Sequence, residues 1–262
     1  FVEAQPTSIK LIFFCFAEFN NLFNLVSFLN TPSPVNESLE KFIRKKQFFS
    51  YIKNRPKIIL LSNYHQNNRN FLIKIFGSFR IDWAVDQIFL DAKIDNSNIN
   101  NNSAIFTSHP DRNVNVLIDI WKKHIFPKNN KNKLYITPID INLRKFNIFN
   151  RSFGDKRELL SDISKSRIAL IPGHKAELFC IAAEECRELC IPIVTLGIGS
   201  LKERVVHNKT GFIAKNYQEF GYYANLLLND ESTWLKMRSN LIKLRGSNKW
   251  SDVAKKFLDK IV

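Results

Sequence analysis

Short apolar runs alternate with amphipathic stretches of about a dozen residues along most of the chain, and this alternation limits the fold more than any other feature. The run at 168–171 is wholly apolar and ends at Pro172 and Gly173, as a buried parallel strand does. From Val114 to Ile125, apolar side chains instead recur at helical spacing. Strands that alternate with such helices build a parallel sheet covered on both faces. We therefore predict an α/β fold.

The same pattern assigns an element to much of the sequence. Strands are expected at 9–16, 58–61, 104–107, 133–136, 168–171, 193–196 and 211–214. Helices are expected at 63–76, 114–125, 155–164, 178–189, 217–228 and 232–244. Ligands of parallel sheets bind at the carboxyl ends of the strands, so the loops after residues 107, 171 and 196 are the places to look for a site.

The domain organisation follows from length and from one polar segment. The 262 residues have room for one large or two modest domains. Between 95 and 103 almost every residue is Asn, Ser or Asp, which favours neither helix nor strand. We expect a partial N-terminal α/β domain at 1–100, a complete one at 101–245 and a C-terminal helix at 246–262. The first residue is Phe, which indicates a truncated or processed start.

The charge balance points to anionic partners. The chain has 39 Lys and Arg against 24 Asp and Glu, a net charge of +15, and 101–157 is its densest positive region. A solvated Lys-rich surface explains much of this excess. Nucleic acid is not an expected partner, because zinc-finger, RNA-binding and helix-turn-helix signatures are missing. The apolar run at 11–16 is far short of the ~20 residues of a membrane-spanning helix, so we expect a cytoplasmic protein.

Metal sites and disulfides are not expected. Four cysteines are too few for a disulfide scaffold, and Cys180, Cys186 and Cys190 fall within one predicted helix and its end. They are interpreted as free, buried thiols in a reducing compartment. A second pair of Cys or His that would complete a tetrahedral zinc site is missing. The sequence also lacks an Asp-x-Asp pair of the kind that holds a divalent ion on a diphosphate.

An ordered set of residues over the last third of the chain resembles a known family. Two glutamates are separated by seven residues, a proline introduces the next short strand, a glycine loop follows, and a glutamate then precedes apolar residues and a Thr-Gly pair. These residues are Glu177, Glu185, Pro192, Gly199, Glu203, Thr210 and Gly211. The set resembles the retaining GT-B glycosyltransferases of family 4.

The resemblance implies a fold and an activity. A GT-B enzyme has two Rossmann-like domains across a cleft, so the C-terminal one would be complete here and the N-terminal one partial. Such an enzyme moves a sugar, with retention, from a nucleotide-diphosphate donor to a glycan or lipid-linked acceptor, as in cell-envelope polysaccharide synthesis. We expect no metal or other cofactor, and peripheral contact with an anionic membrane. Because half of the acceptor domain is missing, we expect donor binding with weak transfer.

The resemblance also assigns roles to the glutamates and to the helix that they flank. Glu177 would face the donor sugar as the catalytic residue, and Glu185 would accept hydrogen bonds from ribose hydroxyls. The helix start at Phe179, Cys180 and Ile181 would offer backbone amides to the diphosphate. Glu184, next to Glu185, is expected to be a solvent-exposed charge.

A basic residue before a helix-opening glycine neutralises the donor phosphates in this family, and Arg112 matches it. Asn113 stands in place of the glycine and tolerates the same left-handed backbone. Ser108 lies in the same loop, and His109 or Lys175 would supply a second phosphate contact. Cys190 occupies a second position where relatives carry glycine, which leaves the geometry of the helix end open.

Three other interpretations stay open. The chain could bind nucleotide sugar without transferring it, or be a different GT-B enzyme such as an epimerase or a phosphorylase-like enzyme. The spacing of the glutamates argues against the epimerase. It could also be a non-enzymatic basic module that binds polyanions.

Overall fold

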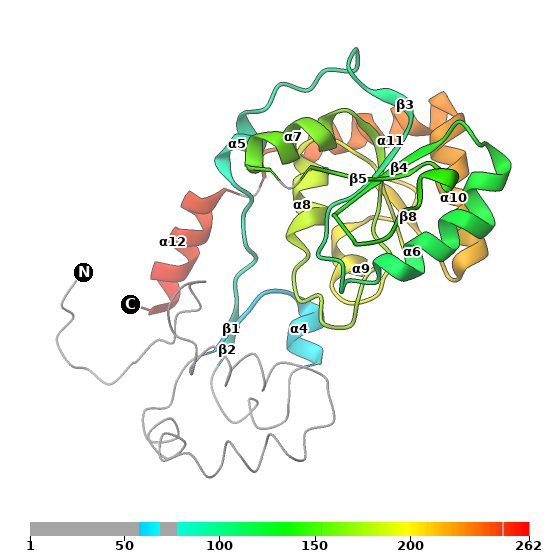
Figure 1. The fold of residues 1–262 in the computed structure, drawn as a ribbon. Helices are drawn as coiled ribbons and strands as arrows, with labels where there is room; N and C mark the ends of the chain where they lie inside the picture. Colours follow the sequence, from blue (N-terminus) through cyan, green and yellow to red (C-terminus); the bar gives the residue numbers. More distant parts are fainter. Residues whose placement is uncertain (1–57, 69–77, 153, 248, 262) are drawn as a thin grey trace, which may run out of the picture. The chain divides into compact units, whose positions relative to one another are not determined.

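The computed structural model describes residues 58–68, 78–152, 154–247 and 249–261 (Figure 1). The chain divides into two compact units. One contains residues up to Asp82 together with those from Ser251 onward, and the other runs from Trp83 to Trp250. The boundary expected between residues 100 and 101 therefore falls inside the second unit. The strand expected at 9–16 lies outside the described residues.

The described part of the first unit contains a small parallel pair of strands. β1 (Ile58–Leu60) pairs with β2 (Ser78–Arg80), and α4 (Asn63–Asn67) follows β1. Ser62 caps α4, because its Oγ accepts a hydrogen bond from the backbone N–H of His65. The predicted strand is confirmed and the helix begins where predicted, but the rest of its expected length lies outside the described residues. α12 (Trp250–Ile261) is the expected C-terminal helix.

The second unit is built on six parallel strands in the order β5-β4-β3-β6-β7-β8. Their bounds are Asn100–Phe106 (β3), Lys133–Ile136 (β4), Ile148–Asn150 (β5), Ser166–Leu170 (β6), Ile193–Thr195 (β7) and Gly211–Ile213 (β8). The chain starts in the middle at β3, moves out to β5, and crosses back to β6 on the other side of β3. The α/β prediction is confirmed. This strand order is that of the doubly wound nucleotide-binding folds.

Two strands differ from expectation. β3 begins at Asn100, inside the Asn-rich segment, because this segment pairs with β6: Asn100 lies opposite Ser166 and its N–H donates to Lys165 O at 2.9 Å. β5 was not predicted from sequence. Pairing with a neighbour thus overrides the weak strand preference of asparagine.

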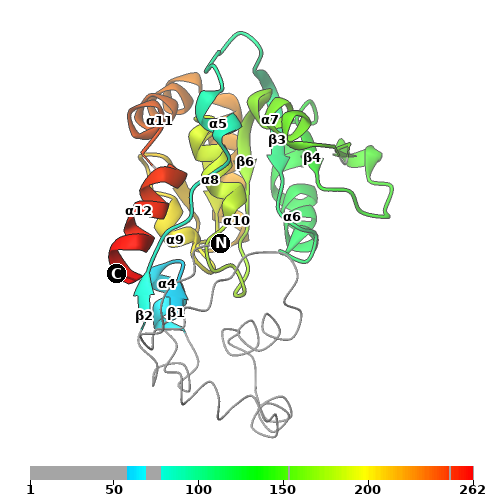
Figure 2. The same ribbon diagram turned by 90° about the vertical axis from the view of Figure 1, so that its left-hand side faces the viewer.

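Helices connect the strands on both sides of the sheet. Their bounds are Gln87–Asp91 (α5), Val114–Ile120 (α6), Lys156–Ser164 (α7), Ile181–Glu188 (α8), Leu201–Arg204 (α9), Tyr217–Asn229 (α10) and Glu231–Leu244 (α11). A π-helical turn, η2 (Trp121–Ile125), extends α6, and the short 3-10 turns η3 (Phe126–Lys128) and η4 (Arg144–Phe146) follow. α5, α7 and α8 lie side by side (Figure 2).

Both ends of α8 use cysteines in left-handed backbone. Cys180 precedes the helix at φ 64°, which delays its start by three residues from the expected position 178. Cys190 follows the helix at φ 58°. Its N–H donates to Arg187 O, and Ile191 N–H donates to Cys186 O. These two bonds form a Schellman motif, so Cys190 keeps the helix end that glycine makes elsewhere.

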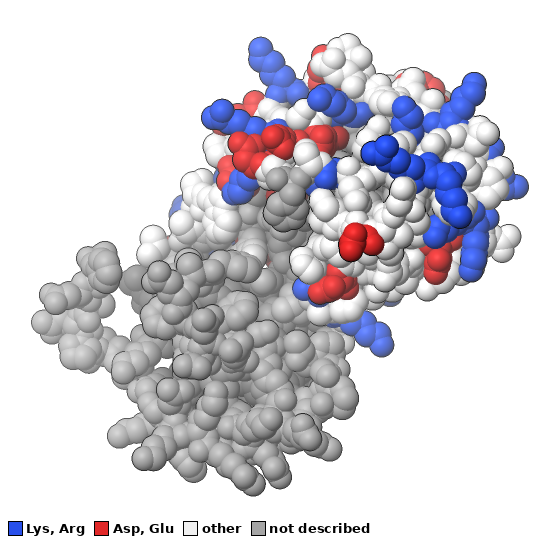
Figure 3. All heavy atoms as spheres, in the orientation of Figure 1, with Lys and Arg blue, Asp and Glu red and all other residues white. Residues whose placement is uncertain are grey.

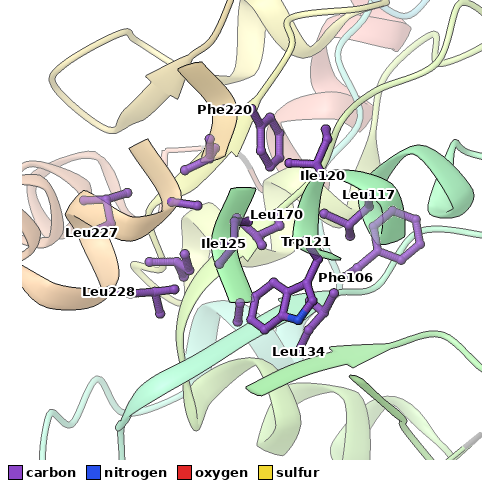
Figure 4. Close-up of a cluster of buried hydrophobic side chains, with 14 of the residues drawn as sticks. Phe106, Leu117, Ile120, Trp121, Ile125, Leu134, Leu170, Phe220, Leu227 and Leu228 are labelled. Carbon is purple, nitrogen blue, oxygen red and sulfur yellow. The ribbon is translucent and has the colours of Figure 1, made fainter. Parts of the chain in front are cut away.

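The core lies in two layers, one on each face of the sheet. Side chains along a strand alternate between faces, so Ile105 packs with α5, α7 and α8 while Phe106 packs with α6, η2 and α10. Figure 4 shows the second layer, centred on Trp121. Its indole is fully buried, and its Nε1 donates to Phe146 O at 2.9 Å. Among the described residues, none of the helices has the length and apolar character needed to cross a bilayer.

Candidate functional site

The candidate site lies where β3 and β6 run side by side. From β3 the chain leaves toward β4, and from β6 it leaves toward β7 on the opposite side. The loops at the two carboxyl ends therefore diverge, which opens a crevice at this point in doubly wound sheets. These loops are 107–113 after β3 and 171–180 after β6, two of the three predicted from sequence.

Side chains of the first loop bind the second loop directly. Asn113 Nδ2 donates to Gly173 O, and Arg112 Nη1 lies 3.2 Å from His174 Nδ1. That same Nδ1 accepts from the backbone N–H of Ala176 at 3.1 Å. Burial and the charge of Arg112 both lower the pKa of His174. His174 is therefore a neutral acceptor that orients the guanidinium.

Asn113 adopts the left-handed backbone expected of it, with φ 67° and ψ 34°. Its side chain makes no cap bond to α6. It reaches across to the second loop instead, so the residue contributes both a backbone angle and a cross-link between loops.

Glu177 faces Arg112, with Oε2 3.9 Å from Arg112 Nε. Its side chain is 15% exposed, and this burial raises the pKa of the carboxyl, while Arg112 and a hydrogen bond from the Cys180 backbone oppose the rise. The structure thus brings together Arg112, Glu177 and Cys180, three of the residues proposed from sequence. The result is a carboxylate and a guanidinium side by side on the loops that follow β3 and β6.

A third loop, after β7, contacts the backbone of Glu177. Ser200 N–H donates to Glu177 O at 2.9 Å, and Glu177 N–H donates to His174 O at 2.9 Å. Gly199 packs so closely that a Cβ there would lie 2.5 Å from His174 O and 2.9 Å from Glu177 O. Its φ of 72° also suits glycine. The backbone of Glu177 is therefore fixed on two sides.

The start of α8 follows the second loop directly. Ile181 and Ala182 are the first helical residues, so their N–H groups precede the intrahelical bonds and carry the positive end of the helix dipole. Phe179 is buried. The guanidinium carbon of Arg204 lies 4.1 Å from the centroid of the Phe179 ring, and the centroid of the Trp83 ring lies 6.1 Å from it. Burial raises the pKa of the Cys180 thiol, which keeps the thiol neutral.

Glu185 lies in the second turn of α8, near Lys156, Arg151 and Asp86. Its pKa is raised to about 7, mainly by burial, against the attraction of Lys156 and Arg151 and with some repulsion from Asp86. Those cations have other partners: Lys156 pairs with Asp86, and Arg151 pairs with Asp162 at 2.9 Å. No hydrogen bond or ion pair reaches the Glu185 carboxyl from the residues that the structure describes. Its oxygens remain available to accept from a ligand.

The expectation for Glu184 is wrong. It is 1% exposed, with Oε2 2.7 Å from Arg187 Nη2 and Oε1 3.1 Å from Arg204 Nη1. α8 turns this residue toward α9 rather than toward solvent. A basic residue three positions on, Arg187, was the available signal of pairing.

The remaining predicted residues lie at the edge of this arrangement. Ser108 is buried, and its carbonyl accepts from Thr137 Oγ1 at 2.9 Å. The His109 side chain is 69% exposed, and its Nδ1 lies 3.5 Å from Asp111 Oδ2. Lys175 is exposed. His174 was missed by sequence reasoning, although a histidine directly after a strand-ending glycine was visible there.

Metal ligands do not cluster in the described ranges, where groups of three or more His, Cys, Asp or Glu suited to an ion are missing. Metal independence stays a prediction.

Comparison with known proteins identifies the class of fold. Residues 143–244 match the family model described as glycosyl transferases group 1. This stretch contains Glu177 and Glu185, whereas Arg112 lies before it. None of the curated proteins matches the chain.

Solved structures resemble the chain over most of its length. TarM from S. aureus, solved with fondaparinux, α-GlcNAc-glycerol and UDP, is 16% identical with TM-score 0.60, covering 82% of this chain and 46% of TarM. Anabaena Alr3699/HepE, with UDP and glucose, is 14% identical with TM-score 0.62, covering 77% and 62%. Pneumococcal GtfA, an O-GlcNAc transferase with UDP and GlcNAc, is 12% identical with TM-score 0.64, covering 82% and 46%.

These likenesses show that the chain has the fold of GT-B glycosyltransferases. It spans between 46% and 62% of the length of those three structures, so it corresponds to part of that fold.

Proposed function

We propose that this chain carries the donor-binding part of a glycosyltransferase. The enzyme would move a sugar from a nucleotide-diphosphate donor to a glycan or lipid-linked acceptor with retention of configuration, as family 4 enzymes do. The carrying observation is that Arg112, Glu177 and the start of α8 meet at the switch point of the sheet. The family match over 143–244 and the UDP named for three structural neighbours support this proposal.

The crevice suits a diphosphate. Arg112 offers a planar fork of donors that is already oriented by His174, and the amides of Ile181 and Ala182 add the helix dipole. Together they would stabilise the negative charge that develops on the departing nucleoside diphosphate. A resident metal is not needed in this account, because the protein's own positive groups take that role.

The two glutamates would hold the two ends of the donor. Glu177, beside Arg112, would contact the sugar as the catalytic residue. Glu185 would accept both hydroxyls of the ribose, which its unpaired oxygens allow. We place the enzyme in the cytoplasm, in synthesis of cell-envelope polysaccharide.

Calorimetric titration of three ligands tests the proposal: a free nucleoside, the nucleoside diphosphate and the nucleotide sugar, in uridine and guanosine series. Glu185→Ala should weaken all three about tenfold or more, because ribose is common to them. Glu177→Ala should weaken only the nucleotide sugar. The control is Glu158→Ala, an exposed glutamate of α7; Glu184 cannot serve because it is buried and paired.

Failure of every nucleotide to bind would refute the proposal. Loss of nucleoside binding by Glu177→Ala and Glu185→Ala alike would show that Glu177 does not face the sugar. Donor binding without consumption of nucleotide sugar, in the presence of acceptors, would favour the non-transferring alternative.

A separate observation concerns the membrane. Much of the basic excess does not surround the crevice: 121–147 has one carboxylate, Asp140, and seven cations. The seven are Lys122, Lys123, Lys128, Lys131, Lys133, Arg144 and Lys145. Lys133 begins β4 and η4 leads into β5, so these groups gather at the amino ends of strands, opposite the crevice. Lys and Arg also dominate the right-hand side of this unit in Figure 3.

We propose that this basic surface contacts anionic lipid headgroups, since each basic residue near such a membrane contributes about 1 kcal/mol. Lys122 and Lys145 belong to this surface, with ammonium groups 5.1 and 5.2 Å from the Phe146 ring centroid. The chain should sediment with vesicles containing phosphatidylglycerol and not with pure phosphatidylcholine. Lys122→Glu with Lys145→Glu should abolish this, and unchanged sedimentation would contradict the assignment.

A further inference from the structure

A buried ion pair joins α8 to α9 next to the candidate site, and it takes no part in the proposed contacts with the donor. Glu184 and Arg204 are 1% and 6% exposed at the side chain, and Arg204 Nη1 lies 3.1 Å from Glu184 Oε1. The second oxygen of Glu184 pairs with Arg187, which also pairs with Glu188 at 2.9 Å. Taking such ions out of water costs several kcal/mol, and apolar residues of similar size often serve stability equally well. We therefore look for a role of this ion pair other than stabilising the fold.

The contact between Arg204 and Phe179 indicates such a role for the ion pair. The guanidinium carbon lies 4.1 Å from the centroid of the Phe179 ring, and Trp83 packs at a tilt of 50°. Glu184 thus fixes the Arg204 guanidinium through the ion pair, and the guanidinium in turn packs on the Phe179 ring. Phe179 lies between Glu177 and Cys180, whose backbone N–H donates to the Glu177 carboxyl. The position of the Phe179 ring consequently influences the conformation of the loop that holds the Glu177 carboxyl and the Cys180 backbone N–H.

The segment 199–204 holds this loop at a second point. Ser200 N–H donates to Glu177 O at 2.9 Å, and Gly199 packs against the same backbone. A few residues later in the same segment, Arg204 contacts Phe179 through its side chain. The segment 199–204 therefore contacts this loop twice: its backbone bonds Glu177, and its Arg204 side chain lies over the Phe179 ring, two residues further on.

We infer that Arg204 is a positioning residue: through Phe179 it keeps the Glu177 carboxyl and the amides at the start of α8 in the arrangement that binds the sugar diphosphate. This rests on the proposed function. Arginine suits the task because its plane covers a ring face while its edge pairs with a carboxylate. Lysine would keep the charge beside Glu184 and lose the plane over Phe179.

The test compares Arg204→Lys with Arg187→Lys as the matched control. Both variants leave a cation beside buried Glu184, but only Arg204→Lys removes the planar guanidinium that lies over the Phe179 ring. Calorimetry should show nucleotide-sugar affinity reduced about tenfold in Arg204→Lys, which corresponds to ~1.4 kcal/mol. Nucleoside affinity, which depends on Glu185, should stay within about threefold of wild type in both variants.

A second variant, Phe179→Leu, leaves the ion pair intact and should cause the same selective loss. Combined with Arg204→Lys it should add little, because both act through one contact. If Arg204→Lys does not fold by circular dichroism, Phe179→Leu alone decides between the outcomes.

Unchanged nucleotide-sugar affinity in Arg204→Lys or in Phe179→Leu would overturn the inference. So would an equal loss in Arg187→Lys, which would assign the effect to the buried charges in general. Absence of nucleotide-sugar binding by the wild-type chain is a different result, because it would overturn the proposed function as well.

Discussion

Glu185→Gln gives the most quantitative prediction, because it removes a buried carboxyl whose titration makes the stability of the wild type depend on pH. The folded chain holds the pKa of Glu185 at about 7, against an ordinary value of 4.5. Between these two values the folded state binds more protons than the unfolded state, so the contribution of Glu185 to stability is present at low pH and lost as pH rises through 7. Glutamine fills the same space without a charge and escapes this loss.

The magnitude follows from the shift. Each pKa unit corresponds to 1.36 kcal/mol, so the free energy of unfolding of Glu185→Gln, relative to wild type, should rise by about 2–3 kcal/mol between pH 5 and pH 8. Urea unfolding at both pH values, followed by tryptophan fluorescence, measures this difference. Glu158→Gln, an exposed site on α7, corrects for the loss of one charge. A difference that stays constant with pH would refute the argument that burial dominates the environment of Glu185.

Three further predictions concern the loops of the crevice. Gly199→Ala should destabilise the chain by about 2 kcal/mol more than Gly246→Ala in thermal unfolding, because both have positive φ but only Gly199 meets backbone atoms. Asn113→Ala should cost about 1–2 kcal/mol more than Asn113→Gly, since glycine keeps the left-handed backbone; equal losses would assign the role to the amide alone. Arg112→Ala should weaken nucleoside-diphosphate binding by about 1.5–3 kcal/mol in calorimetry, and equal binding would remove Arg112 from the site.

The loops of the candidate site could be predicted from sequence, because the carboxyl ends of all strands in a parallel sheet lie at the same edge. Strands predicted to end at 107 and 171 therefore place Arg112 and Glu177 at one edge, and the structure adds that these two strands are neighbours. Left-handed backbone at Asn113 was also predictable, since asparagine replaced glycine there. Cys180 and Cys190 show the limit of that rule. Both occupy left-handed positions that composition alone would not assign to cysteine.

Features that depend on packing could not be predicted. Glu184 and Glu185 are neighbours with the same chemistry, yet one is paired with two arginines and the other has none. Which of them faces α9 depends on how α8 is rotated about its axis when it packs, and no local sequence pattern reports this rotation. The densest positive region of the sequence, 101–157, contains Arg112. The topology places most of its basic residues at the opposite end of the sheet, which no local sequence pattern reports.

The most direct test of the central claim is a crystal structure of the chain with a bound nucleotide sugar. The diphosphate should lie within hydrogen-bond distance of Arg112 and of the Ile181 and Ala182 amides, with the sugar beside Glu177 and the ribose at Glu185. A nucleotide bound elsewhere, for example on the basic surface at Lys122 and Lys145, with the crevice between β3 and β6 empty, would contradict the account.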